Sequence, residues 1–176
     1  IGVVGLGRLG KVHAQNIAYK IPNAELAAAC SIVPAELEYA KQELGVTDVY
    51  TDYREMLAKA DIDAVVIVTT SSEHCWQIEA ALDAGKHVFS EKPLGVDVAQ
   101  CKQAEAAVER HPDLTFMLGF MRRYDKSYAY AKQKIEEGAI GTPYLVKATG
   151  IDPEAFVDGA IRFAKTSGGI FLDMAI

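Results

Sequence analysis

Cysteine is scarce in this chain, and long apolar runs are absent from its sequence. Only Cys30, Cys75 and Cys101 occur among the 176 residues, and they lie too far apart for a metal site or a disulfide framework. We interpret them as buried small side chains in a cytoplasmic protein, and we expect no bound metal. No apolar run reaches the roughly 18 residues of a membrane span, and no signal peptide is recognised.

Positive charge is also in deficit. The chain carries 18 Lys and Arg against 24 Asp and Glu, which gives a net charge of −6. Because nucleic-acid binding usually selects a basic face, this balance argues against a nucleic-acid partner. A chain of 176 residues forms one domain or slightly more, and it can bury about 70% of its unfolded surface without a metal or disulfide.

Up to about residue 120 the sequence alternates short apolar segments with helical patterns. Residues 64–68 are apolar throughout, which is typical of a strand buried on both faces of a parallel sheet. The alternation predicts an α/β fold with a Rossmann-type, doubly wound parallel sheet. The expected strands are 1–4, 25–30, 49–50, 64–68, 86–89 and 115–118, and the expected helices are 10–20, 34–44, 52–60, 73–84 and 98–110.

The pattern changes after residue 120, where we place a domain boundary. We expect a dinucleotide-binding domain over 1–120 and the beginning of a second, α+β domain over 121–176. In the second part we expect one long helix over 124–137 with Asp125 as a candidate cap, a strand over 144–150 and an aperiodic segment over 152–167.

Gly5, Gly7 and Gly10 form a Gly-x-Gly-x-x-Gly motif between the first expected strand and helix. There the first glycine allows a tight turn, the second lets the main chain approach a pyrophosphate, and the third lets the helix pack on the strand. The N–H groups at the helix start, with Arg8 and Leu9, face the phosphates. The motif predicts dinucleotide binding; the alternatives are a glycine turn without a ligand and a methyltransferase cofactor loop.

The second expected strand ends without the acidic residue that usually holds the adenosine ribose. Ser31 stands at that position, and its hydroxyl can bond a ribose hydroxyl without repelling a phosphate. Arg8 either reaches a 2′-phosphate or is a solvated surface arginine. The sequence therefore predicts NAD as the cofactor and leaves NADP open.

Polar residues follow the fourth and fifth expected strands: Thr69 and Thr70 after one, Glu91 and Lys92 after the other. Because ligands gather at the carboxyl ends of parallel strands, these residues are expected beside the glycine loop as cofactor contacts. His74 opens the next helix, either as a contact near the cofactor or as a packing or capping residue.

Lys92 is the candidate for chemistry. At this edge its ammonium can hydrogen-bond a substrate hydroxyl and favour the alkoxide-like state as hydride departs. The alternative is a surface lysine near a turn. Asp173 lies in an otherwise apolar run, where an unpartnered charge is costly, and this favours a functional role for it.

Taken together, the glycine loop, His74, the run 84–88 and Glu91-Lys92-Pro93 resemble the N-terminal half of the glucose-fructose oxidoreductase/inositol dehydrogenase (Gfo/Idh/MocA) family. Segments 119–125 and 168–176 resemble the inositol dehydrogenase branch in particular. The resemblance implies an NAD(P)-dependent oxidoreductase that moves a hydride from a secondary alcohol of a cyclic polyol or sugar, with inositol the best match. It also implies a homo-oligomer, most simply a tetramer.

In such enzymes the lysine acts with an aspartate and with a histidine four residues later. Lys92 and Asp173 match the first two, and the histidine falls at position 177, one beyond the printed sequence. We therefore expect these residues to be a piece of a longer protein. Arg122 and Asp152 match positions near the polyol; for Arg122 the alternative is an ion pair at the domain junction.

Two other functions remain open at this point. One is an oxidoreductase of the same family that acts on another sugar. The other is a non-catalytic NAD(P)-binding regulatory protein, against which the joint presence of Lys92 and Asp173 speaks.

Overall fold

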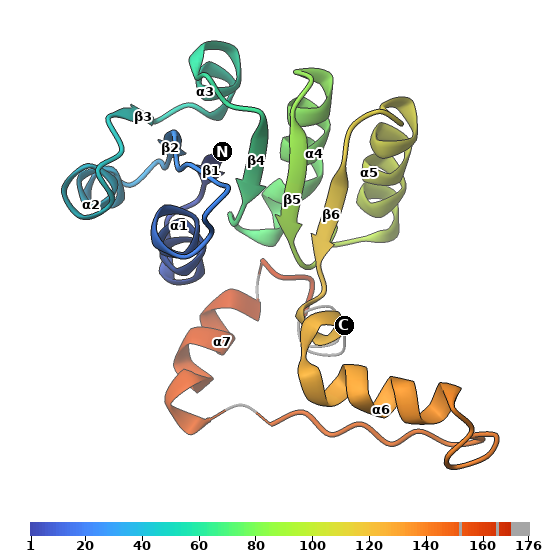
Figure 1. The fold of residues 1–176 in the computed structure, drawn as a ribbon. Helices are drawn as coiled ribbons and strands as arrows, with labels where there is room; N and C mark the ends of the chain where they lie inside the picture. The colour runs from blue at the N-terminus through green and yellow to red at the C-terminus, as the bar shows by residue number, and fades with distance from the viewer. Residues whose placement is uncertain (152, 165, 170–176) are drawn as a thin grey trace.

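Parallel strands form one sheet in the order β3-β2-β1-β4-β5-β6 (Figure 1). The computed structural model describes residues 1–151, 153–164 and 166–169. The chain winds outward in both directions from the pair β1–β4, which confirms the predicted doubly wound, Rossmann-type sheet. The strands are β1 Gly2–Val4, β2 Ala28–Cys30, β3 Asp48–Tyr50, β4 Ala64–Ile67, β5 His87–Glu91 and β6 Phe116–Gly119.

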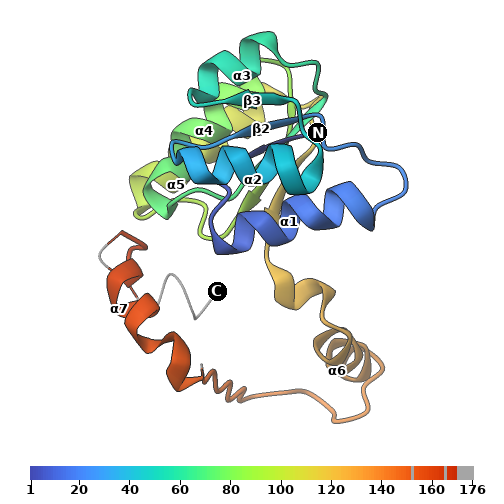
Figure 2. The same cartoon turned by 90° about the vertical axis from the view of Figure 1, so that its left-hand side faces the viewer.

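Helices cover both faces of the sheet (Figures 1 and 2). Met56, Ile78 and Ala104, one from each of α3, α4 and α5, pack into one apolar cluster. Ile17 of α1 and Ala40 of α2 belong to the cluster on the opposite face. The helices are α1 Arg8–Tyr19, α2 Pro34–Leu44, α3 Tyr53–Lys59, α4 Ser71–Asp83 and α5 Val98–Arg110.

The apolar run of β4 explains why the sheet needs two helical layers. Val65 and Ile67 belong to the cluster beneath α3, α4 and α5, whereas Val66 belongs to the cluster beneath α1 and α2. Successive side chains of a strand point to opposite faces, so an uninterrupted apolar run is stable only when both faces are covered. Full burial of each such side chain is worth roughly 1.5–3 kcal/mol.

Several helix ends follow directly from single residues. Asp52 accepts the N–H of Glu55 at 3.0 Å and so caps the start of α3. Asp97 caps α5 in the same way through Gln100. Gly45 ends α2 with a φ of 71°, a left-handed conformation that glycine adopts without strain. The predicted ranges of α2 and α5 are therefore confirmed to the residue.

Beyond β6 the chain leaves the sheet and forms two helices near its carboxyl edge (Figures 1 and 2). The expected single helix over 124–137 is wrong at its start, because Asp125 accepts the N–H groups of Ser127 and Tyr128 and so separates two elements. These are the 3₁₀ helix η1 Met121–Tyr124 and the helix α6 Lys126–Glu136. None of the helices in the described ranges is long and apolar enough to cross a membrane.

The strand expected over 144–150 is also wrong. These residues are exposed and form neither strand nor helix. The alternation of apolar and polar residues suits the two faces of a strand. A strand also needs a neighbouring strand for its main-chain hydrogen bonds, and no described strand lies beside residues 144–150. The segment described as aperiodic instead contains η2 Glu154–Phe156 and the helix α7 Val157–Ala164.

We predict that the three thiols differ in reactivity. Burial, with a smaller contribution from the Asp52 carboxylate, raises the pKa of Cys30 to about 12, and burial also raises the pKa of Cys75. Cys101 is only half-buried. In the folded protein at pH 8, iodoacetamide followed by mass spectrometry should label Cys101 first, and Cys30 and Cys75 only after denaturation. Labelling of native Cys30 at the rate of Cys101 would contradict the packing described above.

Candidate active site

The register of the sheet brings the predicted site residues to one edge. Val4 of β1 pairs with Ile67 of β4, and Ile67 pairs with Ser90 of β5. Gly5 follows Val4 directly, and Lys92 comes two residues after Ser90. Neighbouring strands are about 4.8 Å apart, so the glycine loop and Lys92 lie about two strand spacings from each other.

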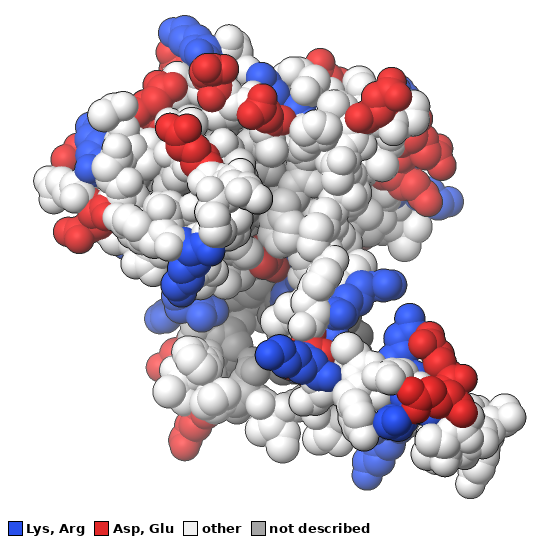
Figure 3. Space-filling model, viewed as in Figure 1, with Lys and Arg blue, Asp and Glu red and all other residues white. Residues whose placement is uncertain are grey.

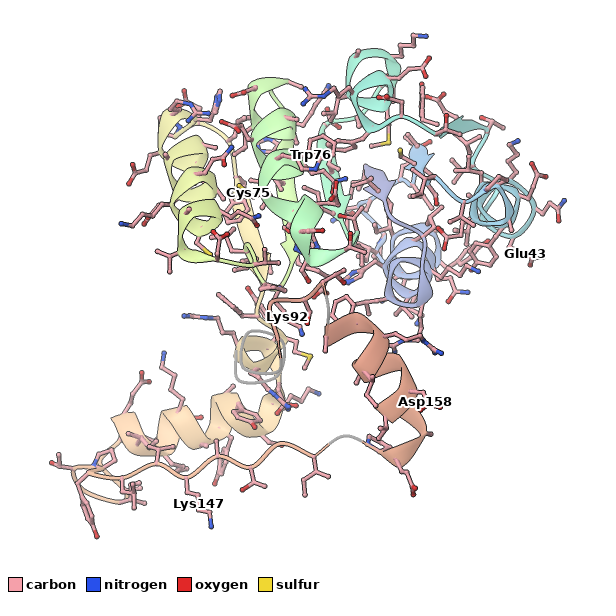
Figure 4. All side chains as sticks on the ribbon, turned by 180° about the vertical axis from the view of Figure 1, so that it is seen from behind. Glu43, Cys75, Trp76, Lys92, Lys147 and Asp158 are labelled. Atoms are coloured by element: carbon pink, nitrogen blue, oxygen red, sulfur yellow. The ribbon has the colours of Figure 1, made fainter. Side chains whose placement is uncertain are left out.

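The surroundings of Lys92 support this placement. Figure 4 shows Lys92 where the sheet faces α6 and α7. In the space-filling view, Lys and Arg side chains lie near this edge and on α6, and acidic side chains lie among them as well as over the helices above (Figure 3). Cations are therefore available near this edge to attract an anionic ligand, although the chain is acidic overall.

The three glycines of the loop differ in the space around them. Gly5 and Gly10 are packed too closely against main chain to carry a side chain, whereas Gly7 faces open space. Gly5 has a φ of 85°, and a Cβ there would lie 2.6 Å from the carbonyl oxygen of Val68. A Cβ on Gly10 would lie 1.9 Å from the carbonyl oxygen of Gly5. A Cβ on Gly7, in contrast, would meet no heavy atom within 4 Å. The loop therefore fits a pyrophosphate, which needs main chain open to solvent at its second glycine.

The start of α1 is equally suited to an anion. Gly7 is the residue before its first turn, no side chain caps it, and the first turn carries no acidic residue. Arg8 and Leu9 are exposed there. The N–H groups of such a turn, with the partial positive charge of the helix end, are the usual partners of a phosphate. The guanidinium of Arg8 itself lies 5.6 Å from the ring of Phe156.

Ser31, expected as a ribose contact, is buried, and its hydroxyl already has partners. Its Oγ donates to Oε2 of Glu36 at 2.5 Å and accepts the N–H of Val33 at 3.1 Å. Glu36 lies in the first turn of α2 and was not among the predicted site residues. A carboxylate therefore stands at the end of β2 after all, although the sequence places it five residues later than expected.

His74 is buried and joins the loops that follow β4 and β5. Its Nδ1 lies 2.7 Å from the carbonyl oxygen of Pro93, and its Nε2 lies 3.2 Å from that of Thr69. Thr69 donates its hydroxyl proton to Gln77 at 2.6 Å, and the carbonyl of Thr70 accepts the N–H of Glu73. These contacts favour the packing interpretation of His74: it ties the chain after Lys92 to the neighbouring loop.

Glu91 holds the other side of Lys92. Its Oε2 accepts the N–H of Lys92 at 3.2 Å, while its Oε1 lies 2.9 Å from Nε2 of His13 on α1. The ring of His13 packs against Phe89, with centroids 5.4 Å apart. No sequence pattern connects His13 with Glu91, because the two are 78 positions apart.

Arg122 lies in η1, with its guanidinium 5.1 Å from the ring of Tyr128. It lines a hollow of about 360 Å³ together with His13 and Glu91. A larger hollow, of about 570 Å³, lies against α5 around Val98 and Phe116; its lining combines apolar side chains with Lys102, Glu105 and Glu109 and includes none of the predicted site residues, so we give it no part in the chemistry. Asp152 and Asp173, also expected in the site, lie outside the described residues. Within the described ranges, no three His, Cys, Asp or Glu side chains are arranged to hold a metal ion.

Comparison with known proteins identifies what this arrangement is similar to. Residues 1–120 match the family model GFO_IDH_MocA, described as an oxidoreductase family with an NAD-binding Rossmann fold. The chain is 39% identical to the scyllo-inositol 2-dehydrogenase (NAD(+)) of Bacillus subtilis, over 99% of the chain and 50% of that protein. It is 35% identical to the myo-inositol 2-dehydrogenase of Thermotoga maritima, over 100% of the chain and 51% of that protein.

A solved structure gives the same result. The scyllo-inositol dehydrogenase of Lactobacillus casei with bound NAD(H) and scyllo-inositol matches with a TM-score of 0.93 and 54% identity, over 99% of this chain and 52% of that one. The chain thus spans about half the length of the relatives it matches.

The glycine loop allows a prediction that separates folding from binding. Gly10→Ala should lower the free energy of unfolding by roughly 1–3 kcal/mol, because its Cβ overlaps the main chain of Gly5. Gly7→Ala should leave stability within about 0.5 kcal/mol, since its Cβ meets open space, yet weaken NADH binding at least about tenfold. Thermal melts and NADH fluorescence titration measure the two effects. Equal loss of stability in both variants would contradict this division.

Proposed function

Since the chain belongs to the oxidoreductase family with the NAD-binding Rossmann fold, we propose that it supplies the cofactor site and the catalytic lysine of an NAD-dependent inositol dehydrogenase. The observation that carries the proposal is the position of Lys92. It follows strand β5 at the edge where the glycine loop and the start of α1 lie, and contacts from Glu91 and His74 fix the main chain around it.

The substrate class comes from the relatives. These relatives are inositol dehydrogenases by name, and the Lactobacillus casei structure contains NAD(H) together with scyllo-inositol. We propose a cyclic polyol as the substrate here, oxidised at a secondary hydroxyl. Arg122, on the wall of the hollow beside Glu91, and Asp152 are the proposed contacts to the remaining hydroxyls.

Lys92 performs the polar part of the chemistry in this proposal. Bound NAD supplies a hydride acceptor at its nicotinamide ring. The Lys92 ammonium hydrogen-bonds the substrate hydroxyl and stabilises negative charge on that oxygen as the C–H bond breaks. The hydroxyl proton passes to a base that Asp173 orients, which we propose is the residue that follows Ile176. General acid–base help of this kind is worth about 10²–10⁴ in rate.

The fixed main chain at Lys92 helps to position its ammonium, because a lysine side chain is long and flexible. Glu91 accepts the N–H of Lys92, and the carbonyl of the next residue, Pro93, lies within hydrogen-bond distance of His74, so the main chain is held on both sides of the lysine stem. Preorganised groups cost no reorganisation at the moment of reaction.

We also propose the setting in which the enzyme works. Residues 1–120 form the cofactor-binding domain, and 121–176 begin an α+β domain for substrate binding and association. The enzyme is proposed to be a cytoplasmic homotetramer, with the small polyol as its ligand and neither nucleic acid nor membrane as a partner.

The decisive experiment replaces Lys92 in the full-length protein. Lys92→Met should lower kcat at least about 100-fold and leave the Kd for NADH within about twofold, because the ammonium acts on the substrate oxygen. Lys102→Met, an exposed lysine of α5, is the matched control and should behave as the wild type. Full turnover by Lys92→Met would remove the lysine from the mechanism.

A substrate panel distinguishes inositol dehydrogenation from the other functions. Wild-type protein with NAD should oxidise myo- or scyllo-inositol with a higher kcat/KM than any aldose, as followed by NADH absorbance. A preference for an aldose would reassign the substrate within the family. Tight NADH binding without oxidation of any polyol would instead support a regulatory role.

A further inference from the structure

The end of β2 carries a feature that bears on which dinucleotide the site accepts. Ser31 occupies the position of the usual ribose-binding acid, but its hydroxyl donates to Oε2 of Glu36 at 2.5 Å. The pair thus presents a carboxylate where the sequence alone showed only a hydroxyl. Ser31 is 5% exposed, so the hydroxyl serves mainly to hold the carboxylate.

Main-chain contacts fix this pair beside the glycine loop. The N–H of Gly5 donates to the carbonyl of Cys30 at 2.9 Å, and the N–H of Ser31 donates to the carbonyl of Tyr50 at 3.1 Å. The turn that approaches the pyrophosphate and the residue that anchors Glu36 are therefore neighbours in one hydrogen-bonded unit. A dinucleotide whose pyrophosphate lies on the loop has its adenosine ribose next to this strand end.

Glu36 is placed to meet a ligand there. Its side chain is only partly buried, and the described part of the chain supplies no hydrogen-bond partner for its Oε1. Ile32, the residue after Ser31, is 87% exposed, so an apolar side chain large enough to cover a purine ring follows the residue that anchors the carboxylate. The exposed aliphatic side chain suits the purine ring of an adenosine, and the acceptor oxygen suits its ribose hydroxyl.

The two cations at the start of α1 each contact an aromatic ring. The Arg8 guanidinium, which the sequence offered as a partner for a 2′-phosphate, lies over Phe156. The Lys11 ammonium lies 4.6 Å from the ring centroid of Tyr39, one turn beyond Glu36 on α2. Each of the two cations on the first turn of α1 therefore already contacts an aromatic ring.

From these contacts we propose that Glu36, held by Ser31, is the residue that makes the site select NAD over NADP. The Oε1 of Glu36 accepts a hydrogen bond from the ribose 2′-hydroxyl. It repels a 2′-phosphate, which carries a charge of about −1.5 to −2 at pH 7. The inference rests on the proposed dinucleotide site and adds to it the residue that determines cofactor choice.

The test measures binding, so it does not depend on turnover. NADH and NADPH are titrated separately by fluorescence into wild type, Glu36→Gln and Ser31→Ala. Wild type should bind NADPH at least about tenfold more weakly than NADH. Glu36→Gln should reduce that ratio at least about tenfold, because the amide keeps the shape and loses the charge. Ser31→Ala should reduce it less, because the carboxylate remains but loses its anchor.

Glu38→Gln is the matched control. Glu38 lies two residues along the same helix, is exposed and pairs with Lys41 at 3.0 Å, so the same change of charge there should leave the ratio unchanged. Thermal melts confirm that the variants are folded. An unchanged ratio in folded Glu36→Gln, or a wild type that prefers NADPH, overturns the inference and leaves the dehydrogenase proposal intact. A wild type that binds neither dinucleotide overturns both.

Discussion

The close crossing of main chain between β1 and α1 is the contact on which the rest of this site depends. Gly10 approaches the carbonyl of Gly5 so closely that a single added carbon would lie 1.9 Å from that oxygen, and Gly5 is confined in the same way against Val68. This crossing sets α1 directly on the sheet, and it leaves Gly7 and the first N–H groups of α1 facing open space. The absence of side chains at two positions thus creates both the packing and the phosphate site.

The same crossing places His13 where it can reach the lysine loop. His13 lies on α1 near the level of Glu91, so the helix that begins at the glycine loop also supports the end of β5. His74 supports the following residues from α4 on the other face of the sheet. Two helices from opposite layers therefore hold the short segment that contains Lys92, and the proposed reaction uses a lysine whose main chain is fixed from both sides.

Sequence patterns were informative wherever one local cause decides the structure. Proline, glycine and aspartate at helix ends gave α2 and α5 their limits, and the apolar run of β4 gave the buried sheet. The strand expected over 144–150 was wrong because side-chain alternation says nothing about a pairing partner. The link between Ser31 and Glu36 could be suspected only from their spacing across a strand end and a first helical turn. The link between His13 and Glu91 could not, because it depends on how α1 lies over β5.

The central claim is that one edge of the sheet binds NAD with its reactive ring beside Lys92. A crystal structure of the protein grown with NADH tests it most directly. The account predicts the pyrophosphate against the N–H groups from Gly7 to Gly10, the adenosine ribose within hydrogen-bond distance of Glu36, and the nicotinamide next to the Lys92 ammonium. A dinucleotide bound elsewhere, or one whose nicotinamide end points away from Lys92, would contradict it.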